Sequence, residues 1–247
     1  MRVTRLHALV AAGVVDSFGL ALGWTVFTLL AVETQGLGAA GTYAGAMLLG
    51  VALSASATSF IAAHLDGRRL LRATACAEAF LRVVTFALLL ADAPLPAIAS
   101  AVALTSAMGW TGYAGMRAEV AAIDSGAGTM TFYAMAIAAI EAVGVAVAAL
   151  LPVGAGDGIG DVVLTTVIAA YAASLVPTLV VAGGSRVARS PRMPASRSLA
   201  KDAGPLLAGF GVMALASGPT LLSAALASEL YGRAAVVASA LAFTLGS

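Results

Sequence analysis

The sequence contains few charged residues. Only 10% of its 247 residues are Asp, Glu, Lys or Arg, whereas 61% are hydrophobic. Soluble globular domains carry about 25% charged residues, so this composition excludes an ordinary soluble fold. The net charge of +1 provides no positive field that would attract a polyanion. We therefore expect no nucleic-acid partner.

Metal ligands and nucleophiles are scarce as well. The single cysteine, Cys76, lies inside an apolar segment, which excludes an intramolecular disulfide and a cysteine metal site. We expect it to be a small buried side chain. The two histidines, His7 and His64, lie in different segments, and the sequence shows no His/Asp cluster. The sequence therefore predicts no metal, no other cofactor and no enzyme active site.

Long apolar runs account for most of the chain. A helix needs about 20 apolar residues to cross the ~30 Å hydrocarbon core of a bilayer. Windows of that length predict an all-α, polytopic membrane helix bundle. The predicted spans cover residues 6–32, 41–63, 70–91, 96–116, 130–151, 162–182 and 204–228, followed by 234–247.

The charges between the predicted spans alternate in sign. Eleven of the 13 basic residues fall on the side of the N-terminus, Arg233 lies on the other side, and Arg82 lies within a span. Cytoplasmic loops of membrane proteins carry an excess of Lys and Arg, so we expect a cytoplasmic N-terminus. The excess of Arg over Lys, 12 to 1, is typical of a GC-rich bacterial genome. We therefore expect a multi-pass protein of the bacterial cytoplasmic membrane.

The sequence predicts three parts. Residues 1–184 form a six-helix bundle, and residues 185–203 form a basic, Pro/Ser-rich cytoplasmic linker that is either solvated or lies on anionic lipid headgroups. Residues 204–247 hold the first two helices of an incomplete C-terminal bundle. The last predicted span has 14 residues, which rise only about 21 Å as a helix, short of the ~30 Å core. We therefore expect the chain to be a fragment of a longer protein.

Two acidic residues lie near the middle of predicted spans without an obvious partner. They are Asp16 in the first span and Glu141 in the fifth. A charge at the centre of a membrane helix costs about 2.5–3.5 kcal/mol on insertion scales, so such residues usually face a bundle interior or a water-filled path. We expect Asp16 and Glu141 to couple protons or to recognise a cationic substrate. The structural alternative is a protonated acid bonded to neighbouring hydroxyls or carbonyls.

Three further residues complete this mid-depth set. Glu78 and Arg82 are four residues apart, one helical turn, in the order that favours an ion pair. A structural Glu78–Arg82 pair is the simpler interpretation, and a link from Arg82 to Asp16 is the functional alternative. Trp110 lies far from both predicted interfaces, where it either forms a cavity wall that stacks on a flat or cationic substrate or packs in the core.

Two short motifs, together with this layout, resemble the major facilitator superfamily. Residues 15–19, Val-Asp-Ser-Phe-Gly, resemble the Asp-Ser-x-Gly pattern in first helices of its bacterial drug-efflux-like members. Residues 62–69, Ala-Ala-His-Leu-Asp-Gly-Arg-Arg, resemble its loop Gly-x-x-x-Asp-x-x-Gly-Arg-Arg, with Ala in place of the first Gly and a shorter spacer. The fifth span lacks the Gly-Pro antiporter motif of that family.

This resemblance implies a secondary active transporter that works by alternating access, built as two six-helix halves. The chain would then supply the N-terminal half and the beginning of the C-terminal one. The implied partners are the lipid bilayer, a small-molecule substrate, protons and the missing C-terminal half. In the loop, Asp66, Arg68 and Arg69 would form a charge latch at the cytoplasmic face; ordinary anchoring of positive charge at the membrane is the alternative.

Two other functions stay open at this point. Asp66-Gly67 before the arginines is weakly similar to a lipid-headgroup transferase site, although the further aspartates at four-residue spacing are missing. A membrane-embedded enzyme of that kind is one alternative. A truncated membrane protein that transports nothing is the other, and the short last span favours it.

Overall fold

The structure is a computed structural model that describes residues 2–152, 158–189, 223, 225–232, 235–239 and 242. All regular elements among these residues are helical, and none is a strand. The principal helices are α1 (Arg2–Gln35), α2 (Leu37–His64), α3 (Gly67–Leu90), α4 (Leu95–Ile123), α5 (Ala127–Leu150), α6 (Gly158–Ala173) and α7 (Val176–Ala182).

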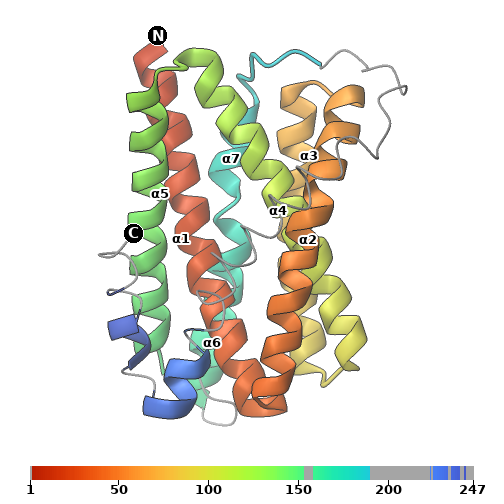
Figure 1. Cartoon of the computed structure of the whole chain (residues 1–247), viewed down its shortest axis with the longest axis vertical. Coiled ribbons are helices and arrows are strands. Elements are labelled where there is room, and N and C mark those ends of the chain that lie inside the picture. The colour runs from red at the N-terminus through yellow and green to blue at the C-terminus, as the bar shows by residue number, and fades with distance from the viewer. Residues whose placement is uncertain are drawn as a thin grey trace.

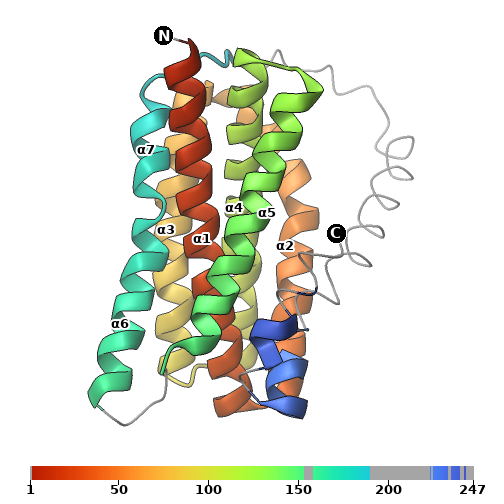
Figure 2. The same cartoon turned by 90° about the vertical axis from the view of Figure 1, so that its left-hand side faces the viewer.

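The helices run side by side along the long axis of the molecule and are joined by short turns (Figure 1). α1 lies at the centre and packs against α2, α4, α5, α6 and α7. α3 packs against α4 and also contacts α6 and α7. In Figure 2, α6 and α7 follow one another along one side of the bundle, and α2 lies on the opposite side.

Among the described residues, five stretches are long and apolar enough to cross a membrane, as expected of a membrane protein, and the predicted α-helical bundle is present. The five stretches are Thr4–Gln35, Leu37–His64, Gly67–Leu90, Ala127–Leu150 and Gly158–Ala182. α4 is also long, with 29 residues. It is not among the five.

The last of these stretches is not one continuous helix. The sequence predicts a single span over residues 162–182, but the helix is interrupted at Ser174 and Leu175, between α6 and α7. Pro177 explains the interruption, because proline has no N–H to donate and its ring clashes with the carbonyl four residues earlier. The backbone N–H of Leu175 donates to Ala172 at 3.4 Å instead of to Tyr171. The Tyr171 carbonyl is therefore available to another donor.

Two large apolar clusters follow one another along the bundle, and a small third one contains Leu29 and Ala149. One large cluster surrounds Phe27, Tyr43 and Phe86. The other surrounds Leu9 and Tyr133 and includes residues near the opposite end of the helices. On α1, Leu9 and Ala12 belong to one of the large clusters, and the other contains Leu22, Val26, Phe27, Leu30 and Ala31. Residues 16 and 17 lie between them, at mid-depth, which is where the polar side chains gather.

Two expectations about other segments need correction or limitation. Cys76 is exposed on α3 and not buried, because its position faces away from the helices that pack against α3. Of the predicted linker 185–203, residues 185–189 are described and are not helical. The remainder, and most of the spans predicted at 204–228 and 234–247, lie outside the described residues.

Candidate functional site: a polar cavity at the centre of the bundle

A cavity of about 540 Å³ opens between the helices at mid-depth. Residues from α1 to α6 line it, together with Ser223, Val236 and Ser239. Most of the lining is apolar, and the remainder falls into groups of acidic, aromatic and hydroxyl side chains. The acidic group is Asp16, Glu78 and Glu141, and the aromatic group includes Trp24, Trp110 and Tyr113. The structure thus brings the predicted residues Asp16, Glu141 and Trp110 to one space.

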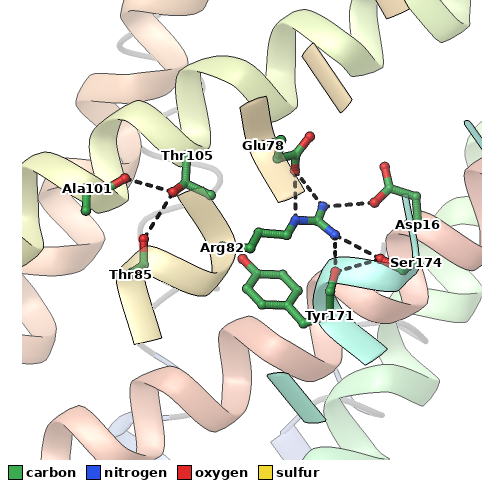
Figure 3. Close-up of polar contacts among 8 residues, drawn as sticks. All are labelled: Asp16, Glu78, Arg82, Thr85, Ala101, Thr105, Tyr171 and Ser174. Carbon is green, nitrogen blue, oxygen red and sulfur yellow. Dashed lines mark hydrogen bonds and ion pairs between the residues drawn. The ribbon is translucent and has the colours of Figure 1, made fainter. Parts of the chain in front are cut away.

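Arg82 is the centre of the polar contacts beside this cavity (Figure 3). Its Nε and Nη2 donate to Glu78 Oε1 at 3.0 and 2.5 Å, and Nη2 also donates to Asp16 Oδ1 at 2.8 Å. Its Nη1 donates to the Tyr171 carbonyl at 2.7 Å and to Ser174 Oγ at 2.8 Å. A guanidinium has five N–H donors, so every one of them has an acceptor here.

The three charged members of this cluster differ in exposure. The Arg82 side chain is 0% exposed and that of Glu78 is 4% exposed, whereas that of Asp16 is 29% exposed. The Tyr171 ring covers the guanidinium carbon at 4.5 Å from the ring centroid, a cation–π contact. Arg82 is therefore shielded inside the bundle, whereas Asp16 and Glu78 both line the cavity and Asp16 is the more exposed of the two.

Both interpretations of Arg82 from the sequence are present together. The Glu78–Arg82 contact within α3 exists, and Arg82 also reaches Asp16 on α1. Asp16 therefore has a partner, contrary to what its position in the sequence indicates. The reason is tertiary, because Asp16 and Arg82 are 66 residues apart and meet only when α1 packs beside α3 and α6.

Glycines on α1 allow this close approach. A Cβ atom at Gly19 would lie 2.3 Å from Ser174 Cβ, and one at Gly23 would lie 2.3 Å from the Tyr171 ring. Small residues four apart are typical of membrane helices whose backbones approach closely. Gly19 and Gly23 thus place α1 against the α6–α7 break and bring Asp16 within reach of Arg82.

Glu141 on α5 differs from the other two acids. No basic side chain of the described residues lies within ion-pair distance of it. Ser17 lies beside its carboxyl group, and Asp16 is close enough for the two charges to interact. If all three acids and Arg82 were charged, the site would hold three negative charges against one positive charge. Such an excess in an apolar bundle favours the uptake of a proton or another cation.

Aromatic side chains form one wall of the cavity. The Trp110 and Tyr113 rings make an edge-to-face contact with centroids 5.6 Å apart, and Tyr113 stacks on Tyr133 at 6.3 Å. Trp110 and Tyr113 also line a second pocket of about 370 Å³ between α2 and α4, near Arg117. These two rings therefore separate the central cavity from a smaller pocket on the side of the basic loops. Trp24 adds an indole N–H that has no acceptor among the described residues.

The residues of the motif-like loop lie apart from the cavity. Asp66 caps α3, because its Oδ1 accepts the Arg69 backbone N–H at 2.8 Å. Arg68 and Arg69 are exposed, and neither forms an ion pair with a described residue. Within the described chain, Asp66 acts locally as an N-cap; the structure does not bring this loop to the site.

The structure reveals a second buried acid, Glu119, that the sequence does not predict. Glu119 on α4 is 1% exposed and pairs with Arg5 of α1 at 2.9 Å. It also accepts hydrogen bonds from the Ser185 hydroxyl and from the Arg186 and Val187 backbone N–H groups. The signal available in the sequence was its helical register, since Met116 and Val120 beside it are buried. Glu119 thus holds residues 185–187, the start of the predicted linker, against the basic end of the bundle.

Among the residues that the structure describes, no three His, Cys, Asp or Glu side chains are grouped so that they could hold a metal ion. Comparison of the chain with protein-family models, with curated proteins and with solved structures found no match. What the chain does must therefore be inferred from the residues of the cavity.

Proposed function

We propose that the chain is part of a secondary active transporter that exports small molecules in exchange for protons. The observation that carries this proposal is the pair of carboxyl groups, Asp16 and Glu141, that line one cavity at the middle of a membrane bundle. Ionisable groups inside membrane spans are costly and mark ion and substrate pathways. Substrate sites of secondary transporters lie at the same mid-depth position.

The charge balance of the site supports proton coupling. Three carboxyl groups face one guanidinium, and Glu141 has no basic partner in the described part of the chain. A proton or an organic cation at Asp16 and Glu141 would neutralise the excess. Exchange of one for the other is the elementary step of proton-driven export. The Trp24, Trp110 and Tyr113 rings would offer stacking surfaces to a flat or cationic molecule.

The wider architecture of this proposal follows the resemblance to the major facilitator superfamily. The bundle up to Ala182 would be the N-terminal six-helix half, with α6 and α7 together as its sixth span. The basic end, where Glu119 holds residues 185–187, would face the cytoplasm of a bacterial cell. A C-terminal half of the same protein would close the other side of the pathway.

Proton-coupled transport is tested with the full-length protein in proteoliposomes. Ethidium, a flat aromatic cation, serves as the transported probe, and an internal pH-sensitive dye reports proton movement. We expect an imposed pH gradient to drive ethidium transport, and Asp16→Asn or Glu141→Gln to abolish the gradient dependence. Glu33→Gln and Asp161→Asn are matched controls, because Glu33 and Asp161 are exposed acids outside the cavity. Unchanged pH dependence in both cavity variants would refute proton coupling at this site.

A further inference from the structure

The break between α6 and α7 is held by a side chain of another helix. Tyr171 loses its usual backbone donor at the break, and its carbonyl instead accepts from Arg82 Nη1 at 2.7 Å and from the Ser174 hydroxyl at 2.9 Å. The Ser174 hydroxyl in turn accepts from the same Nη1 at 2.8 Å. A carbonyl freed inside a membrane helix needs a replacement donor, and Arg82 supplies it.

The same guanidinium also holds Asp16, the more exposed of the two cavity acids that it binds. Nη2 is shared by Asp16 on α1 and Glu78 on α3, while Nη1 is bound only at the break. Arg82 therefore connects an ionisable group of the cavity to the joint between two helices. The carboxylates bind Nη2 and the break binds Nη1 of the same rigid, planar group. The guanidinium therefore cannot turn toward a carboxylate without moving Nη1 at the break.

We propose that Arg82 is a positioning residue that couples the charge on Asp16 to the angle between α6 and α7. With Asp16 ionised, carboxylates on two helices hold the guanidinium, and Nη1 clamps the Tyr171 carbonyl. With Asp16 neutral, Glu78 is the remaining anionic partner and already accepts from Nε and Nη2 at one oxygen. The guanidinium then turns so that these two donors bind both Glu78 oxygens, the bidentate geometry that carboxylates favour. That turn withdraws Nη1 from Tyr171 and releases the break.

The segment that moves is α6. α7 is restrained at its other end, because Arg5 donates to the Val181 carbonyl at 3.4 Å and Glu119 binds the chain directly after α7. Among the principal helices, α6 packs mainly against α1 and α3. A change of about 10–20° at Ser174 would displace Val162, twelve residues away, by about 3–6 Å at 1.5 Å per residue.

Other ionisable groups face this cluster and determine the controls. Four of them interact electrostatically with Asp16: Glu78 on α3, Tyr171 on α6, and Tyr133 and Glu141 on α5. Of these, Glu141 shares the cavity with Asp16 but makes no contact with Arg82. Glu141→Gln is therefore the matched control for Asp16→Asn, since each variant neutralises one acid of the same site.

The test is a pair of distances measured by electron–electron double resonance in nanodiscs, with Cys76→Ser as background. Spin labels at Leu49 and Val162 report α6, and labels at Leu49 and Val180 report α7; all three positions are exposed. We expect Asp16→Asn to shift the Leu49–Val162 distance by about 3–6 Å and to leave Leu49–Val180 unchanged. Glu141→Gln should shift neither distance.

Two further variants keep the inference testable if Asp16→Asn folds poorly. Arg82→Lys keeps the charge but cannot bind both sides at once, and should reproduce the α6 shift. Ser174→Ala keeps every charge and removes one acceptor of Nη1, and should give a smaller shift of the same sign. An unchanged Leu49–Val162 distance in Asp16→Asn, or in both of these variants, would overturn the proposal, as would an equal shift in Glu141→Gln.

This inference rests on the proposed function, because the coupling matters only if the charge on Asp16 changes during transport. Its test nevertheless needs no transported molecule. If wild-type protein moved no protons with ethidium but Asp16→Asn still shifted α6 selectively, the coupling of Asp16 to α6 through Arg82 would be supported and proton-coupled transport rejected. If transport were normal and Asp16→Asn did not shift α6, only the coupling through Arg82 would be refuted.

Discussion

The clearest energetic prediction concerns the removal of Arg82. The Arg82→Met variant deletes a guanidinium that is 0% exposed and whose five N–H groups are all bonded. It leaves Glu78 and Asp16 without a counter-charge and the Tyr171 carbonyl without its main donor. Removing one partner of a buried ion pair typically costs about 3–5 kcal/mol, because the other charge stays buried and uncompensated. We expect a loss of that size in the free energy of unfolding.

A compensated variant separates this mechanism from a simple loss of packing. In Asp16→Asn/Glu78→Gln/Arg82→Met, neither carboxylate bound by Arg82 is left unpaired, so most of the destabilisation should disappear even though the Arg82 side chain is missing here too. Unfolding is followed by tryptophan fluorescence during titration with SDS in mixed micelles. Equal stability of Arg82→Met and wild type would refute the role of Arg82 as an internal counter-charge. So would a triple variant as unstable as the single one.

Three further predictions concern packing, the loop before α5 and the linker. Gly19→Ala should destabilise the protein by about 1–3 kcal/mol through overpacking, since the new Cβ would meet Ser174 at 2.3 Å; Gly45→Ala, with nothing within 4 Å, should change stability little in the same assay. Hydrogen bonds from the Thr129 hydroxyl and the Gly126 N–H lower the pKa of exposed Asp124, so their contribution to stability is present above the pKa of the unfolded chain and is lost as pH falls through the folded pKa. Thr129→Val should return the pKa of Asp124 toward its ordinary value in a carboxyl NMR titration, and an unmoved titration curve would contradict this account. Glu119→Gln should increase the mobility of a spin label at Ala188, because it weakens the acceptor for residues 185–187. Glu33→Gln should leave that mobility unchanged. Equal spectra of the two variants would contradict the role of Glu119 in holding residues 185–187.

Much of the local structure can be read from short-range patterns. The apolar runs predict the helices because a backbone in a bilayer must satisfy its hydrogen bonds internally. The contact between Glu78 and Arg82 follows from one turn of helix. The break before α7 has a local signal as well, since Pro177 stands inside the apolar stretch. The span predicted over 162–182 lies within Gly158–Ala182, which is long and apolar enough to cross a membrane, but hydropathy does not reveal the break inside it.

The partners of the mid-depth acids could not be read in the same way. Asp16 lies on α1 and its partner on α3, and the Tyr171 and Ser174 acceptors come 89 and 92 residues after Arg82. Glu119 shows the same limit, because the residues that bind it lie 66–68 positions later and its other partner, Arg5, lies 114 positions earlier. Hydropathy gives the depth of a residue in a span but not the direction in which it faces.

By itself, the sequence determined that this chain is a helical membrane protein with ionisable residues at mid-depth, because helix length and burial of charge depend on composition along a single segment. The tertiary structure decided which of those residues meet. The close approach of α1 at Gly19 and Gly23 turns one intrahelical ion pair into a junction of three helices around Arg82. It also leaves Glu141 in the same cavity without a basic neighbour among the described residues. Contacts of that kind depend on the packing of helix faces, which no single segment specifies.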